Sequence, residues 1–286
     1  MKIITDSRCL DYVSPGHAEA PQRVSACLEK LRSQGSLPIE WGAPVLPNRR
    51  QLLRGHSATQ LQRLGVAEDF DEDTPALPRI STHARRSVGG MLAALQSALT
   101  GETAFSLMRP PGHHATPDQS MGFCYLNNVA LGVLEAAQVK SRRIAVLDFD
   151  AHHGNGTEAI LHGHPQCWLF SIHQHPAYPG TGLHHRGNCR NYPMKPGTPR
   201  EEYRVALAGI IEDIRALKPD FLAVSAGFDA YRGDPQAEQC LEIDDYHWLG
   251  GLIRELRVPT FHALEGGYSA ELPELVLAYL TGLAGR

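Results

Sequence analysis

The sequence predicts an α/β protein with a parallel sheet covered by helices on both faces. Short apolar runs rich in β-branched or aromatic residues alternate along the chain with segments of helical period, and this alternation is typical of parallel sheets. The chain has 286 residues, which is long enough to bury a large core. Because no repeat or low-complexity linker divides the chain, we expect one catalytic domain over residues 1–286.

The strands are expected where short apolar runs end at turn residues. They are Ile3–Thr5, Ala104–Met108, Ile144–Phe149, Trp168–Ile172, Phe221–Ser225 and Thr260–Leu264. Helices are expected where apolar residues recur on one face, as in Ser87–Leu99, after which Gly101 is a stop signal. The other helical segments are Asn128–Ala137, Glu201–Leu217, Tyr246–Leu256 and Leu272–Leu283.

The composition is that of a soluble globular protein, with 42% hydrophobic and 20% charged residues. A net charge of -4 gives no general attraction to nucleic acid or to an anionic membrane. Six cysteines without a Cys-x-x-Cys pair argue against a thiolate zinc site and against a disulfide scaffold. The start of the chain lacks the apolar core of a signal peptide, so we expect a cytoplasmic protein without nucleic-acid or membrane partners.

Five polar, glycine-bearing clusters each follow a predicted strand. They are RPPGHH (109–114), DAHHGNG (150–156), HQHPAYPGTG (173–182), AGFDAYRGDP (226–235) and EGGYS (265–269). In parallel α/β sheets the ligand site lies at the carboxyl ends of the strands. We therefore expect these clusters to meet at one edge of the sheet and to form the functional site.

The second cluster has the pattern of a cation site. Asp148, Asp150 and His152 are spaced by two and follow the apolar run IAVL, where uncompensated carboxylates would be costly. A lone Asp-x-Asp is usually a solvated turn or a helix cap, but here two histidines follow it directly. A catalytic zinc commonly has three protein ligands and one open position. Asp150 and His152 supply two of them, and Asp229, after another buried strand, is the best third ligand.

The other clusters supply candidates for acid–base work. A histidine pair in a loop is most often structural, but His113 and His114 reach the same edge as the metal site and titrate near neutral pH. Asp148 and Asn155 could each orient one of these rings. Tyr268 follows two glycines and is the best donor to a developing oxyanion.

The motifs RPPGHHA, GFCYLNN, DFDAHHGNGT, AGFDAYRGDP and EGGY resemble the histone deacetylase family, which includes acetylpolyamine amidohydrolases and acetoin-utilisation proteins. The resemblance runs from HAEAPQR (17–23) to Tyr268 and places the chain near the class II-like, bacterial-type branch, because Asn155 stands where another branch has aspartate. It implies the arginase/deacetylase fold, with three layers and a mostly parallel central sheet of about eight strands flanked by helices.

The resemblance also implies roles residue by residue. It assigns one zinc ion per chain to Asp150, His152 and Asp229, and catalysis to His113, His114 and Tyr268. It places Gly122, Phe123 and Tyr178 in the substrate tunnel, Gln236 at its rim and Arg23 in an inner pocket behind the metal. It implies a structural potassium ion at Asp148, Asp150, His152 and Ser171.

The implied reaction is the removal of an acetyl or other acyl group from acyl-lysine or a small acylated amine. Zinc would polarise the amide carbonyl and lower the pKa of its water, and a histidine would take the proton. Arginases share Asp-Ala-His but need a second aspartate-rich segment, and the region around Asp229 fits one zinc better than two metal ions. A related zinc hydrolase cleaving another amide or ester, and a non-catalytic binding protein, remain alternatives; the sequence does not determine the oligomeric state.

Overall fold

The structure is a computed structural model that describes residues 1–66, 68–139 and 141–286. Its central feature is an eight-stranded sheet with the order β2-β1-β3-β8-β7-β4-β5-β6. Every neighbouring pair of these strands is parallel. The strands are β1 (Lys2–Ile4), β2 (Glu40–Gly42), β3 (Ala104–Ser106), β4 (Ile144–Asp148), β5 (Cys167–Gln174), β6 (Cys189–Met194), β7 (Phe221–Ala226) and β8 (Thr260–Leu264).

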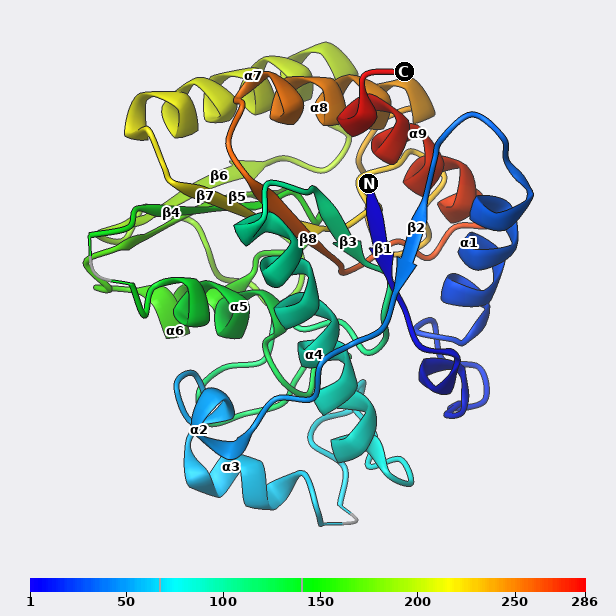
Figure 1. Cartoon of the computed structure of the whole chain (residues 1–286), viewed down its shortest axis with the longest axis vertical. Coiled ribbons are helices and arrows are strands. Elements are labelled where there is room, and N and C mark those ends of the chain that lie inside the picture. The colour runs from blue at the N-terminus through cyan, green and yellow to red at the C-terminus, as the bar shows by residue number, and fades with distance from the viewer. Residues whose placement is uncertain (67, 140) are drawn as a thin grey trace.

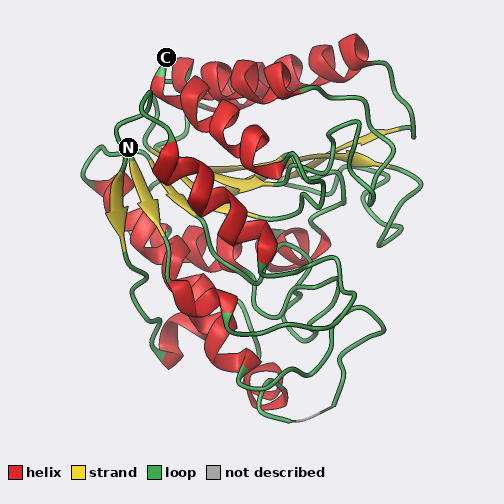
Figure 2. Cartoon of the chain, turned by 90° about the vertical axis from the view of Figure 1, so that its right-hand side faces the viewer, coloured by secondary structure: helices red, strands yellow, loops and turns green. Residues whose placement is uncertain are grey.

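Helices cover both faces of the sheet and make a three-layer molecule (Figures 1 and 2). On one face lie α1 (Gln22–Ser33), α7 (Arg200–Leu217), α8 (Ile243–Glu255) and α9 (Leu272–Ala284). On the other lie α4 (Ile80–Leu99), α5 (Asn128–Ala136) and α6 (Asn155–Leu161). The short helices η1 (Ser7–Leu10), α2 (Arg49–Leu52) and α3 (Ala58–Arg63) lie in the connections, and α2 and α3 pack near the start of α4.

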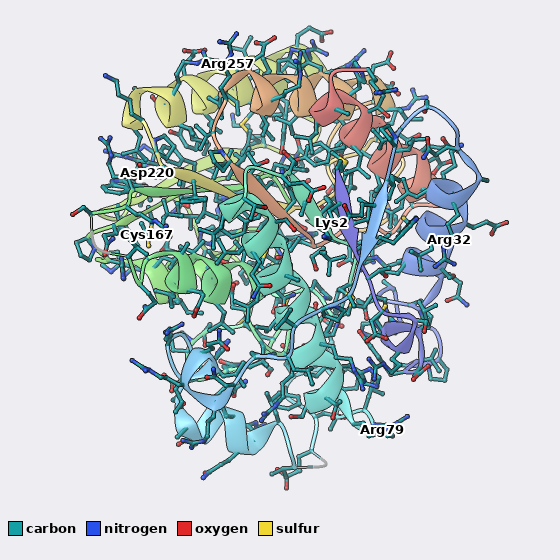
Figure 3. All side chains as sticks on the ribbon, viewed as in Figure 1. Lys2, Arg32, Arg79, Cys167, Asp220 and Arg257 are labelled. Atoms are coloured by element: carbon teal, nitrogen blue, oxygen red, sulfur yellow. The ribbon has the colours of Figure 1, made fainter. Side chains whose placement is uncertain are left out.

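The central strands are buried on both faces, and β4 shows how this divides the core. Ala145 and Leu147 pack with the layer of α7 to α9, whereas Ile144 and Val146 pack with α4 and α5. Successive side chains of a strand point to opposite faces, so one apolar run serves two helix layers. Side chains fill the space between the layers, while charged groups such as Arg32 and Arg79 project outward (Figure 3).

The predicted fold class is confirmed, and all six predicted strands are present within two residues at their ends. The strands that were missed, β2 and β6, are the two edges of the sheet. β2 has three residues, none of them buried, and β6 mixes exposed Arg190 and Pro193 with buried positions, so neither has a continuous apolar run. The helix predicted from Ser87 begins seven residues earlier, at Ile80. Its first turns were missed because they are too polar to show the apolar period of a helix.

One further difference concerns the helices. The helices α1, α2, α3 and α6 were not predicted; α1 carries charged and polar residues around a narrow apolar stripe. Among the described residues no helix has the length and apolarity needed to cross a bilayer.

Candidate active site

The five polar clusters meet at the carboxyl edge of the sheet, as predicted. They surround a pocket of about 100 Å³. Its walls are made by Asp73, His113, His114, Gly122, Phe123, Asp150, His152, Tyr178, Gln236 and Tyr268. These residues come from the segments that follow β3, β4, β5, β7 and β8, together with the loop before α4.

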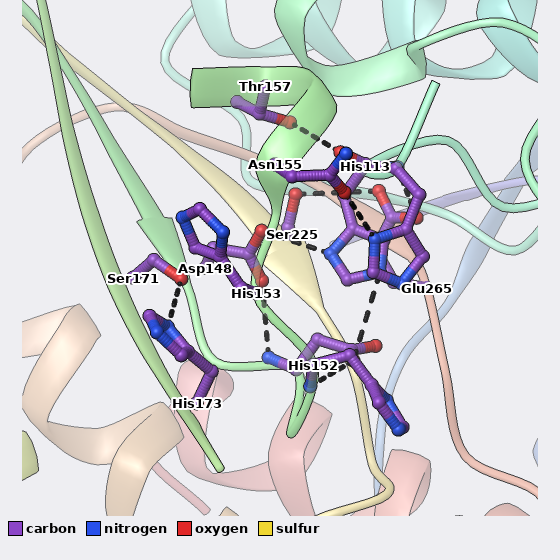
Figure 4. A network of polar contacts seen from close by, with 12 residues as sticks. His113, Asp148, His152, His153, Asn155, Thr157, Ser171, His173, Ser225 and Glu265 are labelled. Atoms are coloured by element: carbon purple, nitrogen blue, oxygen red, sulfur yellow. Dashed lines mark hydrogen bonds and ion pairs between the residues drawn. The ribbon is translucent and has the colours of Figure 1, made fainter. Parts of the chain in front are cut away.

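The three predicted zinc ligands lie together at the base of this pocket. Potential ligand atoms of Asp150, His152 and Asp229 all lie within 4.8 Å of one another. The imidazole Nδ1 of His152 is 3.2 Å from Asp150 Oδ1 and 2.8 Å from Asp229 Oδ2. Its Nε2 lies 3.2 Å from the carbonyl oxygen of Gln236 and donates to it, so the neutral ring keeps on Nδ1 the lone pair that a metal needs. Figure 4 shows His152 within this polar network.

The charges at this site suit a dication. Burial and the neighbouring charge of Asp150 raise the pKa of Asp229 to about 7. Burial acts to lower the pKa of His152, but its hydrogen bonds to the two aspartates outweigh burial and raise that pKa well above its usual value. Two buried carboxylates side by side are costly without a counterion. The donor set of two carboxylates and one imidazole therefore fits a zinc ion with an open position.

The backbone of Gly266 closes one side of the metal site, and its N–H donates to Asp150 Oδ2 at 2.7 Å. A Cβ at this position would lie closer than van der Waals contact to the carboxylate oxygens of Asp150 and Asp229. We expect Gly266→Ala to weaken zinc binding about tenfold or more by displacing these ligands, as measured by competition with a chelator. The control is Gly251→Ala, because a Cβ on this helical glycine meets no atom within 4 Å. Equal zinc affinity in the two variants would contradict this description of the site.

The tandem histidines have different partners. His113 Nδ1 lies 3.1 Å from Asp148 Oδ2, whereas His114 Nδ1 lies 2.8 Å from the amide oxygen of Asn155. Burial acts to lower the pKa of His113, but the charges of Asp150 and Asp148 raise it to about 10. Burial, followed by the nearby His113 and His152, lowers the pKa of His114 well below its usual value. Because an amide oxygen only accepts, His114 carries its proton on Nδ1 and keeps a lone pair on Nε2.

The side chain of Asn127 holds the loop of the tandem histidines in place through hydrogen bonds to its backbone. Its side-chain amide donates to the carbonyl oxygens of His113 (3.4 Å) and Ala115 (3.1 Å). The backbone N–H of Asn127 donates to His56 Nε2 at 2.9 Å, while His56 Nδ1 lies 2.9 Å from the carbonyl oxygen of Thr116. His56 must therefore be neutral, with Nδ1 donating and Nε2 accepting.

Burial lowers the pKa of His56 to about 4, which makes its contribution to stability depend on pH. A depressed pKa gives stability that is present above the unfolded pKa, about 6.5, and is lost as the pH falls toward 4. We expect the advantage of wild type over His56→Gln in free energy of unfolding to shrink by about 1.4 kcal/mol per pH unit across this window. Urea unfolding at several pH values measures it, with exposed His247→Gln as the control that should follow wild type throughout.

Aromatic rings line the walls above the metal site. Tyr178 is 40% exposed, and its ring packs edge-on against His114 with centroids 5.1 Å apart. The ring of Phe123 packs edge-on against Tyr268 at 5.7 Å. Gly122 has a φ of 55°, and a Cβ there would collide with the rings of His114 and Tyr178. The three residues that the resemblance places in a substrate tunnel thus lie together in the wall of the pocket.

Arg23 and Ser171, like Asp148, Asn155 and Asp229, do not line the pocket itself. Arg23 is buried behind Tyr268, with its guanidinium carbon 4.6 Å from the ring centroid and its Nε donating to the carbonyl of Gly267 at 2.7 Å. Ser171 is the register partner of Asp148 on β5, and its hydroxyl lies 2.9 Å from His173 Nδ1 (Figure 4).

Several residues of the site were not predicted. Asp73 lines the mouth of the pocket and belongs to the acidic run EDFDED (68–73), a signal that was available. Glu265 is fully buried, and its Oε2 accepts from the backbone N–H groups of Gly112 (2.7 Å) and His113 (3.1 Å). Glu265 directly follows a buried strand, as Asp150 does, so the same sequence pattern could have identified it as a site residue. Asp234, in the motif RGDP, had no comparable signal.

Glu265 also belongs to a second group of possible ligand atoms, with His113 and Cys124. Its carboxylate is already used by two backbone donors, and burial raises the pKa of the Cys124 thiol well above its usual value. A neutral thiol is a poor zinc ligand, because the thiolate is the form that binds metal. The donor chemistry favours a single metal site at Asp150, His152 and Asp229.

The comparisons with known proteins show which family the chain belongs to. The model of the histone deacetylase domain matches residues 17–283. The chain belongs to the histone deacetylase family. A probable deacetylase of Methanothermobacter thermautotrophicus is 37% identical over 95% of this chain and 87% of its own length. A histone deacetylase-like amidohydrolase of Pseudomonas aeruginosa is 35% identical over 94% of this chain and 77% of its own length.

A solved structure supports the family membership at the level of the fold. The acetylpolyamine aminohydrolase of Burkholderia pseudomallei superposes with a TM-score of 0.89 at 26% sequence identity. The match covers 99% of this chain and 98% of that one. The histone deacetylase fold therefore extends over the whole sheet and both helix layers described above.

Proposed function

We propose that the chain is a zinc-dependent amidohydrolase that removes an acetyl or other acyl group from acyl-lysine or a small acylated amine. The observation that carries this proposal is the convergence in one narrow pocket of a three-ligand metal site, two differently partnered histidines and a tyrosine. Membership of the histone deacetylase family supports the reaction class. A zinc ion held by Asp150, His152 and Asp229 supplies Lewis acidity, which polarises an acyl carbonyl and makes a water molecule more acidic.

The two histidines have distinct tasks in this proposal. His114 accepts the proton of the attacking water at Nε2, because its Nδ1 is held by the neutral Asn155. His113 contacts the carboxylate of Asp148, which favours the cationic form of its ring, and in that form it stabilises negative charge that develops nearby. Environments that push two pKa values apart assign base and acid roles in this way. The proton that His114 has taken is then transferred to the amide nitrogen, so the C–N bond breaks and the free amine leaves.

Tyr268 donates its hydroxyl hydrogen to the developing oxyanion from the opposite wall of the pocket. The neighbouring ring of Phe123 and the guanidinium of Arg23 fix the orientation of the phenol. Burial raises the pKa of Tyr268 well above its usual value, so the phenol is protonated and able to donate at neutral pH.

The entrance favours a slender chain beyond the amide. Gly122, Phe123 and Tyr178 leave room for a methylene chain, which both acyl-lysine and acylated polyamines have. Asp73 and Gln236 are the polar groups at the mouth, where the free amine or the peptide backbone of such substrates would lie. The similarity to a protein named acetylpolyamine aminohydrolase supports an acylated amine as a candidate substrate.

A substrate panel on the zinc-loaded protein tests the proposal. The panel contains acetyl-lysine peptides, acetylputrescine, acetylspermidine and longer acyl-lysines, and the measurement is release of the free amine. We expect turnover of at least one of them, which is lost when a chelator removes the metal and recovered when zinc is restored. Absence of turnover for every acyl amide with zinc at one ion per chain would overturn the proposal.

A structural potassium ion remains part of the proposal. Asp148 and Ser171 are register partners on adjacent strands, so a carboxylate and a hydroxyl lie near the base of the metal site. The Ser171 hydroxyl already contacts His173, and a bound cation would accept one of its lone pairs while the hydroxyl donates to the ring.

A further inference from the structure

The segment that carries Tyr268 has little to hold it in place by itself. Gly266 and Gly267 precede the tyrosine, and Gly267 has a φ of +114°, a conformation that only glycine adopts easily. Two glycines leave many alternative backbone paths, so a contact from outside the segment must select one of them. The backbone N–H groups of Tyr268 and Ser269 show where that contact is made.

Both N–H groups donate to one carboxylate oxygen, Oδ2 of Asp234. The distances are 2.6 Å from Tyr268 N and 3.1 Å from Ser269 N. Asp234 is 6% exposed and lies 34 positions earlier in the chain, in the loop that follows β7. Hydrogen bonds from N–H groups to a buried carboxylate are stronger than those between neutral groups.

The other carboxylate oxygen of Asp234 serves the rim of the pocket. Oδ1 accepts from the backbone N–H of Gln236 at 2.9 Å, and the carbonyl oxygen of Gln236 accepts from His152. An Asx-turn, in which an aspartate side chain accepts from the backbone N–H two residues further on, needs only the oxygen that faces Gln236. The second oxygen, which reaches Tyr268, is therefore not explained by the local turn.

We propose that Asp234 is a positioning residue that fixes the phenol of Tyr268 over the metal site and links it to the rim at Gln236. This inference rests on the proposed function. The remaining contacts of the segment hold other parts of it: Arg23 binds the carbonyl of Gly267 and lies against the tyrosine ring. Asp234 alone, among the described residues, binds the N–H of Tyr268. Its loss frees the backbone from which the phenol projects.

A double-mutant cycle with Tyr268→Phe tests this link. We expect Asp234→Ala to lower kcat about 10- to 100-fold with KM within about threefold, because positioning acts in the transition state. Asp234→Asn should fall between wild type and Asp234→Ala, since its amide oxygen still accepts from Tyr268 N. In the Tyr268→Phe background, Asp234→Ala should lower kcat less than about twofold, because the hydroxyl that it positions is already gone.

Asp245→Asn is the matched control. Asp245 is 1% exposed, accepts from the backbone N–H of Glu242 at 2.8 Å and pairs with Arg200, yet it lies in α8, away from the pocket. It should lower the thermal midpoint without lowering kcat. A comparable loss of kcat in Asp245→Asn, or a full loss from Asp234→Ala in the Tyr268→Phe background, would show a merely structural role and overturn the inference.

The outcomes separate this inference from the proposed function. If zinc-loaded wild type turns over no acyl amide, the proposed function fails. If wild type is active and the two substitutions multiply in their effects on kcat, only the role of Asp234 fails. Zinc content and thermal midpoint are measured for each variant, and if Asp234→Ala does not fold, the same cycle is run with Asp234→Asn, which keeps the shape of the side chain.

Discussion

Replacing His114 with alanine is expected to lower kcat about 10²- to 10⁴-fold, which is the range for losing a general base. The neutral side chain of Asn155 holds Nδ1 of His114, which leaves Nε2 as the basic atom that faces the pocket. Among the described residues no other neutral imidazole lines the pocket, since His113 is paired with Asp148 and His152 belongs to the metal site. KM should change little, because the lost interaction belongs to the transition state. Amine release under saturating substrate, with the zinc content of each preparation, measures the effect.

The control for this prediction is His247→Ala, which removes an exposed histidine on α8. It should leave kcat and zinc content at their wild-type values. A His114→Ala protein that keeps full rate with one zinc ion per chain would show that another group takes the proton. His113→Gln would then be the next variant, because an amide can keep the contact to Asp148 without a cationic ring.

The second large effect is expected from Asp229→Ala, which should lower zinc affinity at least 100-fold and abolish turnover. The variant loses one of three ligands, and it also loses the acceptor for the backbone N–H of Ala151, which donates to Asp229 Oδ1 at 2.7 Å. That second contact holds the loop between Asp150 and His152 in the shape that aims both at the metal. Zinc retained after dialysis against a competing chelator is the measurement.

The same site predicts how zinc binding depends on pH in the wild type. The raised pKa of Asp229, about 7, means that this carboxyl must lose a proton before it binds the metal. Zinc affinity should therefore fall as the pH is lowered from 8 to 6.

The exposed Asp244→Asn serves as the control for Asp229→Ala and should bind zinc like wild type. Full zinc occupancy in Asp229→Ala would remove Asp229 from the ligand set.

The sequence revealed the elements that are buried on both faces and missed those at the edges. β4 and β7 are fully buried and appear as continuous apolar runs. The edge strands β2 and β6 contain exposed polar residues, because one side of an edge strand meets solvent or a loop and needs no apolar side chain. Edge strands are recognised through pairing with a neighbour, which is not a property of their own residues.

The sequence by itself determined the fold class and identified the residues that carry the chemistry of the site. It could do so because a buried strand appears in the sequence as a short apolar run. A carboxylate such as Asp150 directly after an apolar strand indicates a functional site, and this signal can be recognised from the few residues around it. Which group acts on which was decided by the tertiary structure. Asp234 reaches Tyr268 across 34 positions, and Glu265 reaches His113 across 152. These contacts depend on the order of β3, β8, β7 and β4 in the sheet, which brings distant loops to one edge.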